Sequence, residues 1–362
     1  MSTPIQTIDY LATTAVHGSS DPLPEVTRAV YQRNLLSRAQ PYLLHQRFGQ
    51  QHPLQARSGQ SMVFRRYEKV AQATTPLTDG VTPDGTALVK RDYVATVKQY
   101  GNFMIISDWV DMTHVDPVIS EATTLMGENM GETIDSVVRE VLVTGTSAYF
   151  VAEDNTTGAS SGWMNGDARE NVQGTLNKAV VDAVIRDLDS ADSKHFTPLV
   201  NGSTRVNSYP IGKAYWCLIH TDQVHDLFNL EHGGMKLGEE FTPVERYSGN
   251  TGVMETEIGK YRNIRFVTST NTKIWADAGA VHSSLYRSSG GTNADVYAAL
   301  FFARDAYGVI PLQRGSATTI VTPAGGPTDP LKQRNSVGWK GAITAIILND
   351  AWMRRVECAS LI

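Results

Sequence analysis

The sequence contains little charge and almost no cysteine. Only 19% of its 362 residues are charged, and 32 Lys and Arg against 37 Asp and Glu give a formal net charge of -5. A nucleic-acid-binding domain would show a strongly basic composition instead. The two cysteines, Cys217 and Cys358, are too few for a disulfide framework or a four-cysteine metal site. We therefore expect no metal, no cofactor and synthesis in a reducing cytoplasm.

Long apolar runs are also missing. No segment approaches the ~18 uninterrupted apolar residues of a membrane-spanning helix. The first 14 residues lack the basic stretch followed by an apolar stretch that marks a secretory signal. We expect a chain that has no contact with membranes.

The sequence signatures of several enzyme classes are absent as well. There is no Gly-rich loop ending in Gly-Lys-Ser/Thr, no helical pair of zinc-binding histidines and no Gly-x-Ser-x-Gly turn. His220 and Asp222, with His225 nearby, follow a predicted strand and could supply a general base. Thr221 and Asp222 better suit the beginning of a helix, and no nucleophile lies beside them. We expect no catalytic residue, and a hydrolase using His220 and Asp222 is only a minor alternative.

Two runs of alternating apolar residues are present in the first third of the chain. The first begins at Met62, and the second covers residues 93–106. Two turn-forming tripeptides lie between them, so the pattern predicts two strands joined by a long polar loop. Because an isolated hairpin is unstable in water, we expect the tip to contact another subunit. The predicted tip residues are Thr78, Asp79, Gly80, Pro83, Asp84 and Gly85.

The clearest helix is predicted at residues 116–144. Asp116 suits the N-cap, and Pro117 suits the first helical position, where its missing N–H costs nothing. Apolar residues follow at a spacing of three and four residues, which is typical of a helix with one buried face. The residues expected to pack on the subunit's own sheet are Ala122, Met126, Met130 and Ile134.

Shorter elements are predicted in the rest of the chain, which is 41% hydrophobic overall and can bury a substantial core. Helices are expected at residues 172–188 and 221–230. Strands are expected at residues 215–219, 261–268, 296–303, 337–348 and 351–358.

Charge is distributed unevenly along the sequence. Residues 21–70 contain eight basic and three acidic residues, a balance of +5, so the remainder carries -10. Opposite charges favour packing of one part on the other, within a subunit or between copies. We interpret residues 1–52 as an arm whose Arg28, Arg33 and Arg38 contact another copy. A mildly basic lobe without any partner is the alternative.

Several short sequences occur in one order between about residues 35 and 358. In the first third they are Arg38-Ala39-Gln40-Pro41, Phe64-Arg65-Arg66-Tyr67, residues 73–83 and Gln99-Tyr100-Gly101. Later they are Glu257-Ile258-Gly259-Lys260, residues 275–279, Asp305-Ala306-Tyr307-Gly308, Val337-Gly338-Trp339-Lys340 and residues 346–353. With these colinear blocks, the sequence resembles the major capsid protein family of N-four-type tailed phages and related prophages.

The resemblance implies an α+β chain with the capsid fold named after the Hong Kong ninety-seven phage. In that fold, residues 1–52 would form the amino-terminal arm, residues 53–107 the extended hairpin loop, and residues 116–144 the spine helix. The peripheral domain would comprise residues 108–170 and 326–362, and the axial domain residues 171–325.

The resemblance also implies a function and a set of partners. Proteins of this family form pentamers and hexamers that build an icosahedral head around double-stranded DNA. The chain would thus be a structural protein of the virion, assembled in the cytoplasm of the host bacterium. Implied partners are other copies of the chain, a separate scaffolding protein, a portal, an optional decoration protein and DNA contacted without sequence specificity. An encapsulin-like compartment, which shares the fold but holds protein cargo, is the alternative.

Overall fold

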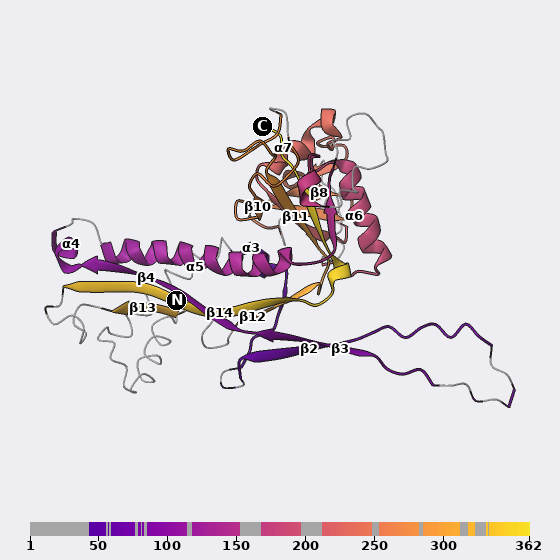
Figure 1. Cartoon of the computed structure of the whole chain (residues 1–362), viewed down its shortest axis with the longest axis horizontal. Coiled ribbons are helices and arrows are strands. Elements are labelled where there is room, and N and C mark those ends of the chain that lie inside the picture. The colour runs from indigo at the N-terminus through magenta and orange to yellow at the C-terminus, as the bar shows by residue number, and fades with distance from the viewer. Residues whose placement is uncertain are drawn as a thin grey trace.

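The computed structural model describes residues 43–55, 57, 59–76, 79–80, 82, 85–113, 118–152, 168–196, 212–247, 253–281, 285–311, 318–322, 331 and 333–362. These residues form two modules that lie side by side, and a two-stranded hairpin projects from one of them (Figure 1). One module is a small sheet covered by a long helix, and the other is an eight-stranded sheet with helices packed on it. The predicted α+β class is confirmed.

The first module is built on two long antiparallel strands, β4 (Lys98–Ser107) and β14 (Arg334–Ile347). The other edge of β14 pairs with β12 (Tyr307–Pro311) and β13 (Thr318–Thr322), and the short β1 (Gln50–Gln51) runs parallel to β12. After β4 comes α4 (Asp108–Thr113). The 26-residue helix α5 (Val118–Val143), called the spine helix below, lies along one face of this sheet (Figure 1).

The spine helix packs its predicted apolar face on the sheet. The four predicted residues are at most 6% exposed, and they are Ala122, Met126, Met130 and Ile134. They share one core cluster with Trp339 of β14. Asn129 adds two hydrogen bonds at the same contact, because its Oδ1 accepts from Trp339 Nε1 at 2.9 Å and from Asn102 Nδ2 at 3.2 Å. The predicted start of the helix, Asp116 and Pro117, lies outside the described residues.

The second module contains the larger sheet. Its strands, in spatial order, are β5 (Ala148–Phe150), β15 (Met353–Cys358), β11 (Val296–Phe302), β6 (Tyr215–His220), β9 (Ile264–Ser269), β8 (Glu257–Tyr261) and β7 (Phe241–Pro243), with β10 (Ile274–Trp275) also paired to β11. Every residue of β6 and β11 is buried, which explains their almost continuous apolar sequences.

The helices of the second module are α6 (Lys178–Ser190) and α7 (Gln223–Phe228). The residues described contain five further short helices: α3 (Leu44–Arg47), η2 (Arg169–Asn171), η3 (Leu230–His232), η4 (Val244–Arg246) and η5 (Asp350–Trp352). The sequence predicted α6 from residue 172, six residues too early. Asn177 fixes its true beginning, because its side chain accepts a hydrogen bond from the Val180 N–H at 3.1 Å.

Residues 43–52 pack on the first module, although the sequence suggested that they continue an arm. Leu44 and Phe48 are buried in the cluster beneath the spine helix. His45 is fully buried, and both its backbone N–H and its ring Nδ1 lie 2.7 Å from the carboxylate of Asp135 on the spine helix. The hydroxyl of Tyr307 donates to the His45 carbonyl. These partners are 90 and 262 residues away along the chain, so the local sequence carries no sign of them.

The second predicted hairpin strand is divided at Val97. β3 (Lys90–Thr96) pairs with β2 (Ser61–Tyr67) in the projecting hairpin, whereas β4 pairs with β14. Because the chain changes its partner strand at this residue, residues 98–107 lie in the first module and not in an extended loop.

The two sheets also divide the rest of the chain differently from the predicted domain boundaries. β12 and β13 lie in the first module, although their residues were assigned to the axial domain. β5 and β15 lie in the eight-stranded sheet, although both were expected in the peripheral domain. The cause is the crossing at residues 348–352, after which β15 pairs with β11 instead of returning to β14.

Two polar side chains contribute to the junction of the modules, where one apolar cluster also includes residues of both. The Asp350 carboxylate accepts hydrogen bonds from the backbone N–H groups of Thr146 and Ser147, at 3.1 and 2.9 Å. Arg355 donates to the carbonyl of Val143 and, at 2.8 Å, to that of Gly145. A cation at the carboxyl end of a helix satisfies carbonyls that have no partner within the helix. The end of the spine helix is therefore held against β15.

Candidate assembly surfaces

The hairpin of β2 and β3 is largely exposed. The two strands pair antiparallel along seven residues each, and the hairpin extends well beyond the body of the molecule (Figure 1). One face is anchored, because Met62 and Phe64 pack against Ile310. The opposite face is open to solvent, and its cross-strand pair Val63 and Val94 is 54% and 61% exposed.

The hairpin stem is basic and its tip is acidic. Stem residues 61–70 and 89–96 contain five basic and two acidic residues, a balance of +3. One acid is neutralised across the strands, where Arg65 Nε donates to Asp92 Oδ1 at 2.8 Å. This hydrogen bond lowers the pKa of Asp92 below its ordinary value. Residues 71–88 contain no basic residue, and their only charges are Asp79 and Asp84.

The described part of the predicted tip is exposed. Asp79 and Gly80 form a turn, and Gly80 has a φ of +74°, which glycine adopts without steric cost. Gly85 is exposed as well. The remaining tip residues, Thr78, Pro83 and Asp84, lie outside the described residues, as do the arm residues Arg28, Arg33 and Arg38.

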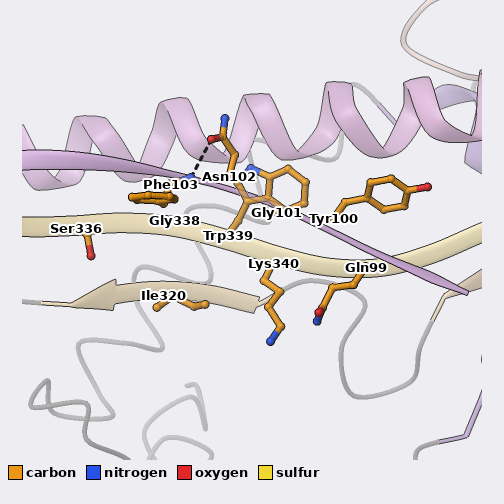
Figure 2. Close-up of a pocket in the computed structure, with 10 residues that line it drawn as sticks. All are labelled: Gln99, Tyr100, Gly101, Asn102, Phe103, Ile320, Ser336, Gly338, Trp339 and Lys340. Carbon is orange, nitrogen blue, oxygen red and sulfur yellow. Dashed lines mark hydrogen bonds between the residues drawn. The ribbon is translucent and has the colours of Figure 1, made fainter. Parts of the chain in front are cut away.

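A groove of about 480 Å³ crosses the sheet of the first module on the side turned away from the spine helix (Figure 2). Phe103 of β4, Gly338 of β14 and Ile320 of β13 lie in one row across three strands. Phe103 is 67% exposed and Ile320 is 41% exposed. Lys340 and Gln99 also line the groove and point away from the spine helix, whereas Asn102 points towards it.

Two glycines shape the floor of this groove. A Cβ atom at Gly338 would lie 2.8 Å from the Cβ of Phe103, and one at Gly101 would lie 2.8 Å from the carbonyl oxygen of Trp339. Glycine at both positions therefore allows β4 and β14 to approach closely. The groove is left with an apolar wall on each side and no side chain between them.

Lys340 gives the groove a positive charge. Its side chain is exposed, and no ion pair of Lys340 is found within the described part of the chain. The outer side of the spine helix has the opposite character, because Glu121 and Glu132 are exposed there. The first module therefore presents a basic, apolar groove on one face and an acidic helix on the other.

His220 and Asp222, the catalytic alternative, are brought together by structural bonds. His220 Nδ1 lies 3.3 Å from Asp222 Oδ2 and accepts from the Asp222 N–H at 3.2 Å. The carboxylate also forms an ion pair with Arg287 and accepts a hydrogen bond from the Tyr297 hydroxyl at 3.1 Å. Burial lowers the pKa of His220, which favours the neutral ring that this arrangement needs. The pair ties the start of α7 to β11.

Sequence reasoning missed the groove. Phe103 was assigned to the second hairpin strand, and Lys340 was only part of a predicted strand. Apolar side chains at three consecutive positions, residues 103–105, were a usable signal. A strand that is apolar on both of its faces has a second surface to cover.

The sequence matches a family model described as Phage capsid protein over residues 90–355. This match covers most of the chain, including both modules. The chain belongs to the phage capsid protein family.

The fold of this capsid protein is similar to that of solved phage capsids. The capsid of Ralstonia phage GP4 gives a TM-score of 0.60 at 12% identity, with 86% of this chain and 87% of the other covered. The cyanophage Pam1 capsid gives 0.53 at 15% identity, with 89% and 92% covered. The capsid of cyanophage P-SCSP1u gives 0.51 at 15% identity, with 86% and 87% covered. No curated protein sequence matches the chain significantly.

These findings confirm the predicted capsid fold and the role of a major capsid protein. The protein is a structural component of the phage head and not an enzyme, which makes the hydrolase alternative wrong. Among the described residues, no helix is long and apolar enough to cross a membrane. Nor does any cluster of three His, Cys, Asp or Glu side chains suited to a metal ion occur in this part of the chain.

Proposed function

We propose that this capsid protein forms pentamers and hexamers of an icosahedral head by docking the hairpin of each subunit on a neighbouring subunit. The observation that carries the proposal is the exposed apolar surface of the hairpin. Eighteen large hydrophobic side chains are exposed among the described residues, and six of them lie on the hairpin: Val63, Tyr67, Val70, Leu88, Val89 and Val94. Because soluble monomers rarely expose large contiguous apolar patches, a neighbouring subunit covers this surface in the shell.

A second apolar surface supports the same proposal. Six of the remaining exposed hydrophobic side chains belong to the first module: Phe103, Met104, Ile105, Trp109, Leu125 and Ile320. The hairpin and the first module together thus account for twelve of the eighteen. Both surfaces belong to one chain, so contacts between copies can cover both.

The proposed domains follow the two modules. The first module serves as the peripheral domain, and the eight-stranded sheet with its helices serves as the axial domain. The hairpin of β2 and β3, with the segment that joins them, serves as the extended loop. Arg28, Arg33 and Arg38 of the arm contact acidic surface on another copy, since the chain outside residues 21–70 carries a balance of -10.

The assembled head encloses double-stranded DNA and contacts it without sequence specificity. A net charge of -5 suits a shell that encloses DNA without condensing it. A separate scaffolding protein, a portal and an optional decoration protein complete the head, which is assembled in the cytoplasm of the host bacterium.

Deleting residues 78–85 tests the docking of the hairpin. We expect a subunit that folds, because this segment lies beyond the paired stem, but that no longer forms closed shells in electron micrographs. Circular dichroism of the deletion variant checks its fold. A variant that folds and still forms shells of normal number and shape would contradict the proposal.

Removing residues 1–42 tests the arm without damage to the packed residues 43–52. We expect the truncated subunits to fold but to form fewer shells. The double variant Arg28→Glu with Arg38→Glu should show a milder loss of shells, and this loss should change with salt concentration. A gel-shift series with duplex DNA tests the competing hypothesis of a DNA-binding arm. Tight, salt-sensitive DNA binding together with unimpaired shell closure would refute an assembly role.

A further inference from the structure

We propose that Asp135 of the spine helix is the positioning residue that fixes the angle between the two modules, and that this angle sets the diameter of the shell. The inference rests on the proposed function, because it concerns the geometry of subunits that assemble. The carboxyl-terminal end of the spine helix reaches the second module, and α3 lies beside the helix there (Figure 1). Side chains from three separate parts of the chain meet at this place.

The carboxylate of Asp135 is completely buried and is shared by two partners. Its Oδ1 accepts a hydrogen bond from the backbone N–H of His45 at 2.7 Å, and its Oδ2 lies 2.7 Å from His45 Nδ1. Oδ2 also accepts a hydrogen bond from Asn271 Nδ2 at 3.0 Å. Asn271 belongs to the second module, where it lies between β9 and β10. The three residues His45, Asp135 and Asn271 are called the clasp below.

The short segment that carries His45 contacts both modules. In the first module, Tyr307 of β12 donates its hydroxyl to the carbonyl of His45. In the second module, the ring of Phe48 lies 5.2 Å from that of Trp216 and 6.0 Å from that of Phe302, measured between ring centres. His45 and Phe48 are neighbours on this segment, so it cannot follow the motion of one module without losing contacts with the other.

The loop that carries Asn271 is bound along the same part of the spine helix. Arg139 Nη1 donates to both the backbone oxygen and the Oδ1 of Asn271, each at 2.8 Å. Lys273 Nζ donates to Glu140 Oε1 at 2.9 Å. A rotation of the spine helix relative to the second module would therefore break several polar contacts at once.

The composition of the clasp suits a geometric role. Buried ionic groups often stabilise a protein less than apolar side chains of similar size, and in some proteins they specify one arrangement among several. His45 is completely buried, and its Nε2 has no hydrogen-bond partner among the described residues. An unsatisfied buried nitrogen lowers stability. The clasp therefore holds a defined geometry at some cost in stability.

The position of the clasp gives it leverage on the shell. Val118, where the described helix begins, precedes Asp135 by 17 residues, which corresponds to about 26 Å along the helix axis. A rotation of about 5° at Asp135 would move that end of the helix by about 2 Å. Contacts between copies close only at the rotation that each subunit imposes on the next. A change in the angle between the modules therefore changes the curvature at which the subunits close.

Distances between spin labels measure this angle in subunits before assembly. Leu125→Cys on the spine helix and Leu237→Cys in the second module provide accessible thiols, since the native side chains are 54% and 62% exposed. The two native cysteines are fully buried and should remain unlabelled. In the parent we expect one narrow distance distribution. Combining His45→Leu with Asp135→Leu should make this distribution at least twice as broad.

Electron microscopy of shells tests the consequence for assembly. We expect the variant with both leucines to melt within a few degrees of the parent but to form shells with a several-fold wider spread of diameters. Tyr307→Phe removes one hydrogen bond to the clasp and should cause a smaller change of the same kind, which keeps the test decisive if the leucine variant does not fold. The matched control is Tyr247→Phe, which removes a hydroxyl that donates to Glu257 Oε1 at 2.9 Å inside the second module. This control should leave the diameter unchanged.

The outcomes separate the clasp from the docking of the hairpin. Broader label distances together with a wider spread of shell diameters are the result that we expect. Narrow label distances or shells of parental diameter, in both the leucine variant and Tyr307→Phe, would overturn the role of Asp135 and leave hairpin docking intact. Normal shells from the deletion of residues 78–85 would refute hairpin docking without changing the label distances of the clasp variants.

Discussion

Truncation of Met130 to alanine tests whether packing on the sheet holds the spine helix in place. Met130 is 1% exposed and belongs to the cluster shared by the helix and β14. Removing a buried methionine side chain costs about 2–5 kcal/mol, which includes the cavity left behind. An unfolding entropy of about 2.1 cal/mol/K per residue corresponds to roughly 0.76 kcal/mol/K for this chain, so the melting temperature should fall by about 3–7 °C.

The assay is thermal unfolding of subunits before assembly, followed by circular dichroism. Leu125→Ala is the matched control, because Leu125 lies on the same helix and is 54% exposed. We expect this variant to melt within about 1 °C of the parent. Met130→Asp should be insoluble, since it buries an unpaired carboxylate. Two results would refute the packing assigned to this face of the helix. One is a Met130→Ala variant with the melting temperature of the parent, and the other is a Leu125→Ala variant whose melting temperature falls as far as that of Met130→Ala.

Three further predictions concern buried polar groups. The carboxylate of Glu357 is buried and forms ion pairs with two arginines. Glu357→Gln should therefore lower the free energy of unfolding by about 3–5 kcal/mol and the melting temperature by about 4–7 °C. An unchanged melting temperature would show that stability does not need this charge. Asn177→Ala should cost about 1 kcal/mol, whereas Asn177→Asp keeps the cap of α6 and most of the stability. Burial raises the pKa of both Cys217 and Cys358, so a thiol reagent should label neither in the folded protein and both after denaturation.

The spine helix and the hairpin stem were predictable because their signals are local. The spacing of apolar residues from Ala122 to Ile134 marked the buried face of the helix. Alternation from Met62 to Tyr67 marked the strand that became β2. In both cases the pattern needs no knowledge of the partner element.

The remaining features depend on contacts between distant segments. His45 is buried and bonds to Asp135 and Tyr307, which lie 90 and 262 residues away in the sequence. A short stretch of sequence around His45 therefore cannot show these contacts. The division of one apolar run into β3 and β4 is decided by the competing partner strands β2 and β14. The groove arises only when β4, β13 and β14 are aligned, so its lysine could not be singled out from the sequence.

Electron microscopy of the purified full-length protein tests the central claim most directly, because assembly into a shell is what distinguishes a capsid protein from other folded chains. The account predicts closed shells, together with rings of five or six subunits at lower concentration. A dispersed population of compact monomers, with a radius of gyration of about 21 Å at every concentration and salt condition, would contradict it.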